Sequence, residues 1–149
     1  MAKNTRDMGQ TNGEMTRIES DKTLIDKEQK EIFSFLSDFN NFGKLMPEQV
    51  TNWQSNADEC SFTISGMANL GMKIAEKRPS DYIRVVKNGE APFDFTMECL
   101  MKETAPGKTE VQLALEANLN PMMKMMVAKP LTNFLNMLVG KLRDLPENA

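Results

Sequence analysis

Hydrophobic and polar residues alternate with a period of two from residue 50 to residue 119, which predicts β-strands. Short stretches rich in Gly, Pro, Asn and Asp interrupt the alternation, and these residues favour tight turns. Strands joined by such short links are antiparallel neighbours. We therefore predict six antiparallel strands, at residues 50–55, 60–65, 70–78, 82–87, 93–103 and 109–119.

The last two of these strands each have one apolar face and one polar face. The apolar positions are Phe93, Phe95, Met97, Cys99 and Met101 in one strand and Val111, Leu113, Leu115, Ala117 and Leu119 in the other. The opposite face carries Asp94, Thr96, Glu98, Gln112 and Glu116. This pattern predicts a sheet with one face covered by the core and the other in contact with water.

Ahead of these strands, the pattern predicts one more strand and then a helix. Residues 16–25 alternate as a strand does, and Asp26 stands three residues before Gln29, the spacing of a capping box at a helix N-terminus. The expected helix carries apolar residues at helical spacing, namely Ile32, Phe33, Phe35, Leu36 and Phe39. Gly43 and Pro47 then mark a break or a short second helix.

A long amphipathic helix is expected after the last strand. Asn120 is a favoured N-cap residue, and Pro121 suits the first helical position. One face of the helix carries Met123, Val127, Leu131, Phe134, Leu138 and Leu142. Pro130 removes a backbone hydrogen bond, so we expect a kink that follows the curvature of the sheet or hinges the first turns as a lid.

The 149 residues are enough for one domain with a buried core. No stretch approaches the ~20 apolar residues of a membrane-spanning helix, and the first residues contain no apolar secretory segment. Residues 1–15 are polar and aperiodic. We expect a disordered tail at residues 1–15, a folded domain at residues 16–146 and a cytoplasmic location.

The charge and the side-chain inventory disfavour several classes of function. The net charge is −3 and the basic residues are dispersed, which disfavours nucleic acid as a partner. There is no His, the commonest general base and metal ligand. Cys60 and Cys99 each lie in a predicted strand, and we expect buried reduced thiols, with a disulfide between them left open. A zinc site is disfavoured, and no cofactor is expected.

The order of these elements resembles the START-like (SRPBCC) superfamily, which includes the birch pollen allergen, lipid-transfer START domains, polyketide cyclases and coenzyme-Q-binding proteins. The most specific segment is KEQKEIFSFLSDFNNFGKLMP, followed by a strand that bears Trp53. The resemblance spans residues 16–145. It implies an α+β helix-grip fold, in which a curved, seven-stranded antiparallel sheet packs around the long C-terminal helix. One or two short helices lie between the first two strands of that fold.

The resemblance also implies a hydrophobic cavity between the sheet and the last helix, and it brings no catalytic residue with it. We expect apolar ligand contacts from Trp53, Met72, Tyr82, Phe95, Met97, Leu113, Leu115, Met122, Met123, Met126 and Phe134. Two interpretations stay open for the methionines near residue 122, which either fill the core irregularly or line a deformable cavity mouth.

Glu76 and Arg84 share strand parity with apolar neighbours, so they are possible inward-facing polar anchors for a ligand. The alternative is that both reach solvent at a strand end, because an unpaired buried charge is costly.

These features favour binding or carriage of a small hydrophobic molecule, such as a lipid, an isoprenoid or a polyketide-like compound. One alternative is a His-free cyclase or dehydratase, for which a shifted pKa of Glu76 or Tyr82 would argue. Another is a protein-interaction module that uses the Met-rich helix, with an exposed apolar patch in place of a cavity. No integral membrane segment is expected.

Overall fold

The computed structural model describes residues 15–66, 68–89 and 91–145, so the predicted tail lies outside the described residues except for Met15. The elements run β1 (Met15–Glu19), β2 (Thr23–Ile25), α1 (Gln29–Leu36), α2 (Phe39–Phe42), the 3₁₀ helix η1 (Gly43–Leu45), β3 (Val50–Ser55), β4 (Glu59–Ile64), β5 (Ala68–Arg78), β6 (Tyr82–Lys87), β7 (Phe95–Ala105), β8 (Lys108–Asn118) and α3 (Pro121–Arg143).

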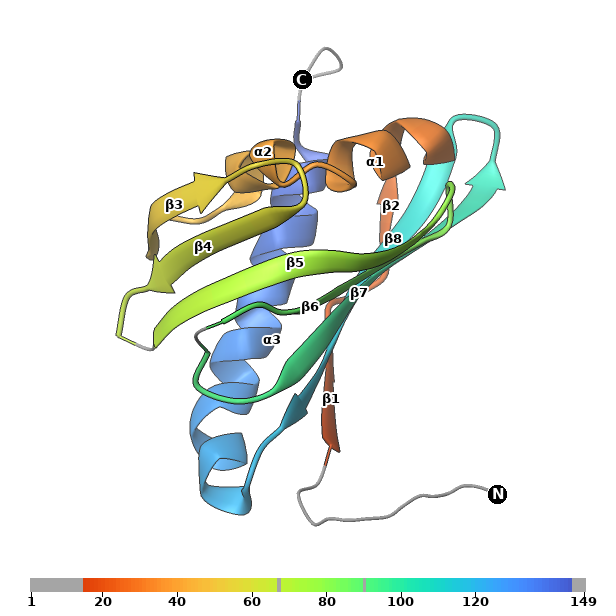
Figure 1. The fold of residues 1–149 in the computed structure, drawn as a ribbon. Coiled ribbons are helices and arrows are strands. Elements are labelled where there is room, and N and C mark those ends of the chain that lie inside the picture. The colour runs from red at the N-terminus through yellow and green to blue at the C-terminus, as the bar shows by residue number, and fades with distance from the viewer. Residues whose placement is uncertain (1–14, 67, 90, 146–149) are drawn as a thin grey trace, which may run out of the picture.

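The strands form one antiparallel sheet that curves around α3, while α1 and α2 cover one end of it (Figure 1). From edge to edge the order is β1, β8, β7, β6, β5, β4 and β3, and β2 also pairs with β8. The predicted helix-grip fold is therefore confirmed. Among the described residues the sheet has eight strands rather than seven, because the first predicted strand is divided in two.

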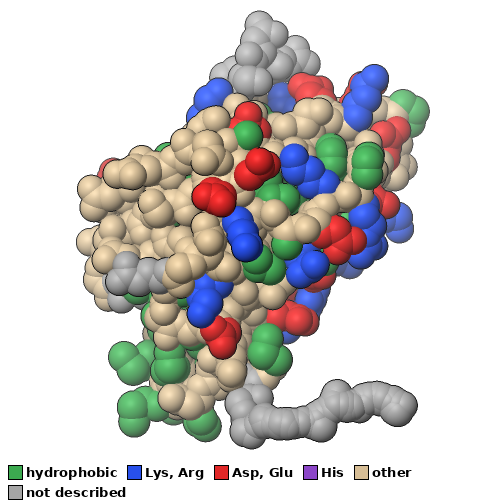
Figure 2. Space-filling model, viewed as in Figure 1, with side chains coloured by type: hydrophobic (Ala, Val, Ile, Leu, Met, Phe, Trp, Pro, Cys, Tyr) green, Lys and Arg blue, Asp and Glu red, His purple; other side chains and the backbone are tan. Residues whose placement is uncertain are grey.

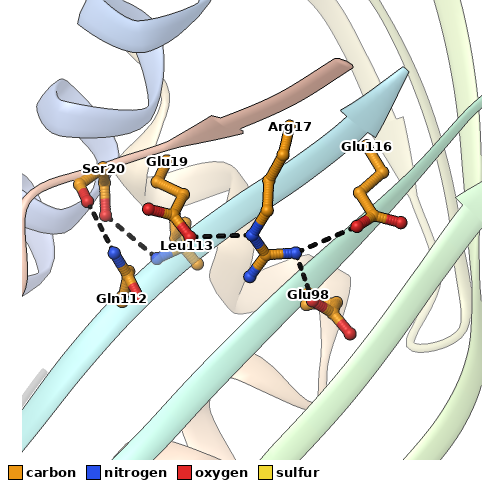
Figure 3. Close-up of polar contacts among 7 residues, drawn as sticks. All are labelled: Arg17, Glu19, Ser20, Glu98, Gln112, Leu113 and Glu116. Carbon is orange, nitrogen blue, oxygen red and sulfur yellow. Dashed lines mark hydrogen bonds and ion pairs between the residues drawn. The ribbon is translucent and has the colours of Figure 1, made fainter. Parts of the chain in front are cut away.

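The division occurs at Ser20, which is buried against β8 (Figure 3). The Ser20 hydroxyl accepts a 3.0 Å hydrogen bond from the Leu113 N–H, and the Ser20 N–H donates to the Leu113 carbonyl at 2.8 Å. The next N–H, of Asp21, turns away and donates to Asn136 Oδ1 of α3 at 2.7 Å. A side chain thus takes over one strand hydrogen bond, and the chain leaves the sheet before β2 begins.

The predicted capping box at Asp26 is wrong. The N-cap of α1 is Glu28, without a side-chain cap, and Asp26 instead forms a 2.7 Å ion pair with Lys108. Gln29 does not reach back to the helix start, because its side-chain amide donates to the Met101 carbonyl at 3.2 Å. Long-range partners on β7 and β8 therefore override the local capping pattern.

The apolar stripe expected on one helix spans two. The carboxylate of Asp38 accepts a 2.9 Å hydrogen bond from the Asn40 N–H and caps α2, so α1 ends before it. Ile32, Leu36 and Phe39 are fully buried, whereas Phe33 and Phe35 are half-buried. Three of the five apolar residues expected on one helix are therefore in the core, and the other two are only partly covered.

The predicted faces of β7 and β8 are confirmed. Phe95, Met97, Cys99 and Met101 are buried on the inner face, and they pair with Ala117, Leu115, Leu113 and Val111, which are buried too. Both Cys60 and Cys99 are buried and free, as expected. The outer face keeps the charged residues of these strands.

Of the two alternatives for Glu76 and Arg84, the inward-facing one is wrong, and both residues lie on the outer face. A register shift lies between Ile74 and Glu76, so the two residues face opposite sides of β5 although both are even-numbered. Arg84 pairs with Glu76 on one side and with Glu98 of β7 on the other, which fixes it on the outer face. Ile83, which is fully buried, takes the inward position on β6.

The helix α3 begins as predicted. Asn120 Oδ1 accepts a 2.8 Å hydrogen bond from the Met123 N–H, and Pro121 occupies the first turn. The helix runs without interruption through Pro130 to Arg143. Its buried side chains are Leu131, Leu135, Leu138, Val139 and Leu142, so none of them lies in the first ten residues of the helix. No helix in the described part of the chain has the length and hydropathy that a membrane span requires.

Candidate functional site

A cavity of about 50 Å³ lies between the inner face of the sheet and α3. Each described side chain that lines it is apolar. They are Phe42, Met46, Phe62, Ile64, Leu70, Met72, Phe93, Phe95, Met97, Leu115, Leu131, Phe134, Leu135 and Leu138. The walls contain five phenylalanines and three methionines, so they combine rigid rings with flexible side chains that can change rotamer.

Strand register brings these side chains together. Met97 on β7 pairs with Leu115 on β8, and Phe62 on β4 pairs with Leu70 on β5. Residues that pair directly across antiparallel strands project from the same face, so both pairs point toward α3. The helix completes the wall with one turn-to-turn stripe that includes Leu131 and Leu138.

A second hollow adjoins the cavity. This groove of about 350 Å³ lies between α3 and the end of β4, and it is lined by Gln49, Ile64, Ser65, Gly66, Met126, Val127, Pro130, Leu131 and Phe134. Ile64, Leu131 and Phe134 line both spaces, so these three side chains separate the groove from the cavity. Phe134 is half-buried at this boundary.

The structure brings five of the expected ligand contacts to the cavity: Met72, Phe95, Met97, Leu115 and Phe134. Met126 lies at the groove instead. Leu113 belongs to the buried core on the same face of β8, outside the cavity lining. Whether these residues contact a ligand stays a prediction.

The other expected contacts lie elsewhere. Trp53 stands behind the cavity wall, where its ring stacks on Phe62 with centroids 5.3 Å apart and its Nε1–H donates to Ser55 Oγ at 3.1 Å. Met123 is half-buried against the core, and Met122 is 72% exposed. Tyr82 faces the outer side of the sheet, because it pairs with Leu100 rather than with an inward residue.

Several cavity residues escaped the sequence analysis as ligand contacts. Phe62, Ile64 and Leu70 alternate correctly along β4 and β5, so their parity could have identified them. Phe42 and Met46 lie at the end of α2 and just after η1, where no period indicates which side chain turns toward the sheet. Leu135 lies beside the predicted helical stripe, within the same broad apolar face.

Glu76, Arg84 and Tyr82, which the sequence suggested as ligand anchors or as acid–base groups, lie on the outer face of the sheet. Glu76 forms ion pairs with Arg78 at 2.9 Å and with Arg84 at 3.3 Å, and hydrogen bonds from Arg78 and then Arg84 lower the pKa of Glu76. Burial, aided by the hydrogen bond to Glu98, raises the pKa of Tyr82 to about 12. Both shifts hold the group in its usual neutral-pH form, so neither side chain is prepared for proton transfer.

Arg17 is the centre of the charged network on this outer face (Figure 3). Its guanidinium contacts Glu19 at 2.7 Å, and Glu98 and Glu116 at 3.2 Å each, so β1 is tied to β8 and β7. The hydrogen bond that Arg17 donates to Glu19 is the main reason that the pKa of Arg17 is raised. These ion pairs therefore lie on the side of the sheet opposite the cavity.

The two thiols offer little reactivity. Burial raises the pKa of Cys60 and of Cys99 to about 12, so both remain protonated at neutral pH and are poor nucleophiles. Among the described residues, no group of three or more Cys, Asp or Glu side chains is placed to hold a metal ion.

The fold was compared with known proteins. No protein-family model matches the sequence, and the search of curated proteins found no match. Solved structures do match. A START superfamily protein from Mycobacterium smegmatis superposes with a TM-score of 0.69 and 14% identity, over 85% of this chain and 94% of that chain. The chain has the START-like fold.

Two further structures with this fold are named for reactions or pathways. Norcoclaurine synthase from Thalictrum flavum, solved as a point mutant with a transition-state analogue, gives a TM-score of 0.72 at 11% identity over 90% of this chain and 95% of that one. The di-domain ARO/CYC protein BexL of the BE-7585A biosynthetic pathway gives 0.67 at 11% identity, over 87% of this chain and 45% of that one. At such identities the likeness establishes the START-like fold and leaves function to the site itself.

Proposed function

We propose that this START-like protein binds a small apolar molecule between its sheet and α3. The observation that supports this proposal is the cavity, whose described lining is entirely apolar and lies where the helix-grip fold separates sheet and helix. Apolar ligand surface removed from water there would contribute about 25 cal/mol per Å². Selectivity would come mainly from shape, because none of the described lining residues is charged.

The size of the cavity limits how a ligand fits. About 50 Å³ is well below the roughly 150 Å³ of an apolar protein cavity that takes up benzene. A ligand of that size must therefore displace side chains. Met46, Met72 and Met97 can do so at low rotamer cost, because their chains are unbranched and flexible.

The groove supplies the remaining volume. Its 350 Å³ lies within the ~300–1,000 Å³ typical of small-molecule sites, and it is separated from the cavity by Phe134 and its neighbours. We propose that a ligand passes from the groove beside Phe134 into the cavity. A linear or flat apolar compound fits this path better than a bulky one.

The similar structures support small-molecule binding in a general way. The norcoclaurine synthase structure holds a transition-state analogue, so this fold can accommodate a small organic molecule. The cavity of the present protein has no ionisable lining residue in its described part, and Tyr82 and Glu76 lie on the outer face. The arrangement therefore favours binding over the cyclase or dehydratase alternative.

Methionine methyl NMR tests this proposal directly. On addition of an apolar fluorescent probe or a fatty acid, the methyl signals of Met46, Met72 and Met97 should shift. Those of the exposed Met122 and Met125 should stay in place. Shifts confined to the exposed methionines would place binding on the surface and overturn the proposal.

A filling mutation provides the second test. Leu115→Phe adds a larger ring to the cavity wall and should weaken probe binding at least about tenfold, because the space for the ligand is reduced. Leu24→Phe is the control, since Leu24 is 51% exposed on β2 and lies outside the cavity. Equal affinities of the two variants would contradict the assigned site.

A further inference from the structure

The first turns of α3 present an apolar surface to solvent. Met122, Met125 and Met126 are 72%, 87% and 68% exposed, and we call them the methionine face. Their spacing of three and four residues puts them on one side of the helix. Figure 2 shows apolar side chains gathered at the lower end of the molecule, where α3 begins in Figure 1.

The charge of α3 opposes that of the whole chain. The helix contains Lys124, Lys129, Lys141 and Arg143 and no acidic residue from Pro121 to Arg143, whereas the chain carries a net charge of −3. Its first turn holds Lys124, although the helix dipole favours acidic residues there. Lys124 and Lys129 are exposed, and neither has an ion-pair partner among the residues that the structure describes.

Along the helix axis the exposed methionines come first and Lys129 follows, as the acyl region of a bilayer is followed by its phosphates. Lys129 follows Met122 by seven residues and lies on the same side of the helix, about 10 Å further along the axis. An apolar helix surface enters the boundary between headgroups and acyl chains by roughly 5–10 Å. If the first turns of α3 enter end-on to a similar depth, the head of Lys129, about 10 Å further along the axis, would lie at the level of the phosphates, and its aliphatic stem would cover apolar surface.

We propose that the methionine face, with Lys129 beside it, docks this protein reversibly on an anionic membrane. A stable protein partner or a second copy fits less well, because such interfaces use about 20 residues on each side, whereas the methionine face consists of three residues. Each lysine near an anionic surface contributes a factor of about five in binding. The expected contact is therefore weak, and salt should reduce it.

The docking surface adjoins the groove, because Met126 belongs to both. Docking would thus turn the groove toward the membrane. The inference does not depend on the proposed ligand, since the methionine face and the lysines are exposed whether or not the cavity is filled.

Sedimentation of the full chain with vesicles tests docking. The protein should bind vesicles of phosphatidylcholine with about one-third phosphatidylserine at least about fivefold more tightly than vesicles of phosphatidylcholine alone. Replacing the methionine face by Met122→Asn, Met125→Asn and Met126→Asn together should abolish binding. Leu24→Asn, at an exposed apolar residue of β2, should leave it unchanged.

A charge variant makes the test independent of the methionines. Lys129→Gln should remove the preference for anionic vesicles, whereas Lys102→Gln, an exposed lysine of β7, should not. Failure of the wild-type protein to bind anionic vesicles would overturn the proposal. It would also be overturned by a wild-type dimer in sedimentation equilibrium that the triple methionine variant loses, because the occupant would then be a second copy.

Discussion

The hydroxyl of Tyr82 donates a 2.6 Å hydrogen bond to Glu98 Oε2 on the outer face of the sheet. The guanidinium of Arg78 lies 4.2 Å from the centre of the Tyr82 ring and covers it. This explains why Tyr82 is buried although it faces away from the core. The arrangement favours the neutral phenol and links the stability of the fold to pH.

Tyr82 should lose its stabilising contribution at high pH. Burial and the contact with Glu98 raise its pKa from 10 to about 12 in the folded protein. The contribution is fully present below pH 10 and is lost as the pH rises through 12, because the unfolded chain releases the proton first. Over that interval the wild type should lose about 2 kcal/mol more unfolding free energy than Tyr82→Phe.

Urea denaturation of both proteins between pH 8 and pH 12 would measure this difference. Cys60 and Cys99, whose pKa values are also raised to about 12, are present in both proteins, so their effect cancels in the comparison. If the unfolding free energies of the two proteins changed with pH in the same way, the hydrogen bond from Tyr82 to Glu98 would be absent in solution.

Two glycines should respond in opposite directions to replacement by alanine. A Cβ on Gly43 would lie 2.5 Å from Trp53 Nε1, and the indole is held by its stacking on Phe62. Gly43→Ala should therefore cost about 1–3 kcal/mol of unfolding free energy. Gly140→Ala is the control, because its Cβ would meet nothing closer than Arg143 Nη2 at 4.0 Å and should stabilise α3 by about 0.5–1 kcal/mol.

Thermal unfolding with Trp53 fluorescence would report both changes. A red-shifted emission in Gly43→Ala would show that the indole has been displaced toward water. If both variants gained stability, the close contact between Gly43 and the indole would be absent in solution.

The two short helices provide a prediction about burial. Phe39 is fully buried and packs edge-to-face on Phe42 with ring centroids 5.6 Å apart, whereas Phe35 is half-buried near Lys44. Phe39→Ala should cost about 3–5 kcal/mol, and Phe35→Ala clearly less. Chemical denaturation would measure the loss of unfolding free energy in both variants. A larger loss in Phe35→Ala would show that Phe35, rather than Phe39, is the core residue.

Sequence periodicity predicted the faces of β7 and β8 because alternation continues there for about ten residues on two paired strands. It failed at Glu76, since a register shift within β5 changes the face without changing the residue types. It failed again at Ser20, where a serine hydroxyl replaces a backbone hydrogen bond. Such local irregularities depend on contacts with distant strands, which a single strand's pattern does not contain.

The sequence predicted part of the cavity lining and misplaced other residues. Met72, Phe95 and Met97 reach the cavity because their strand faces were assigned correctly. Met122 was assigned to the cavity and is exposed, because helical spacing identifies a face but not the point at which the sheet beneath it ends. The position of α3 relative to the sheet follows from the tertiary packing of Leu131 and Leu138, far along the helix.

The cavity methionines should control which ligands the protein accepts. Met72 and Met97 line the cavity from β5 and β7, and each can change shape with little rotamer strain. Replacing both by Leu should change the unfolding free energy by less than about 1.5 kcal/mol, because the two side chains have similar volumes. Ligand preference should narrow, because branched side chains repack less freely.

Binding of fatty acids of graded chain length to the wild type and to the Met72→Leu, Met97→Leu variant would measure this preference. The matched control carries Met122→Leu and Met125→Leu, the same chemical change at exposed positions of α3. We expect the control to bind the same range of chain lengths as the wild type, while the cavity variant binds a narrower range. The same range in all three proteins would mean that Met72 and Met97 do not shape the ligand site.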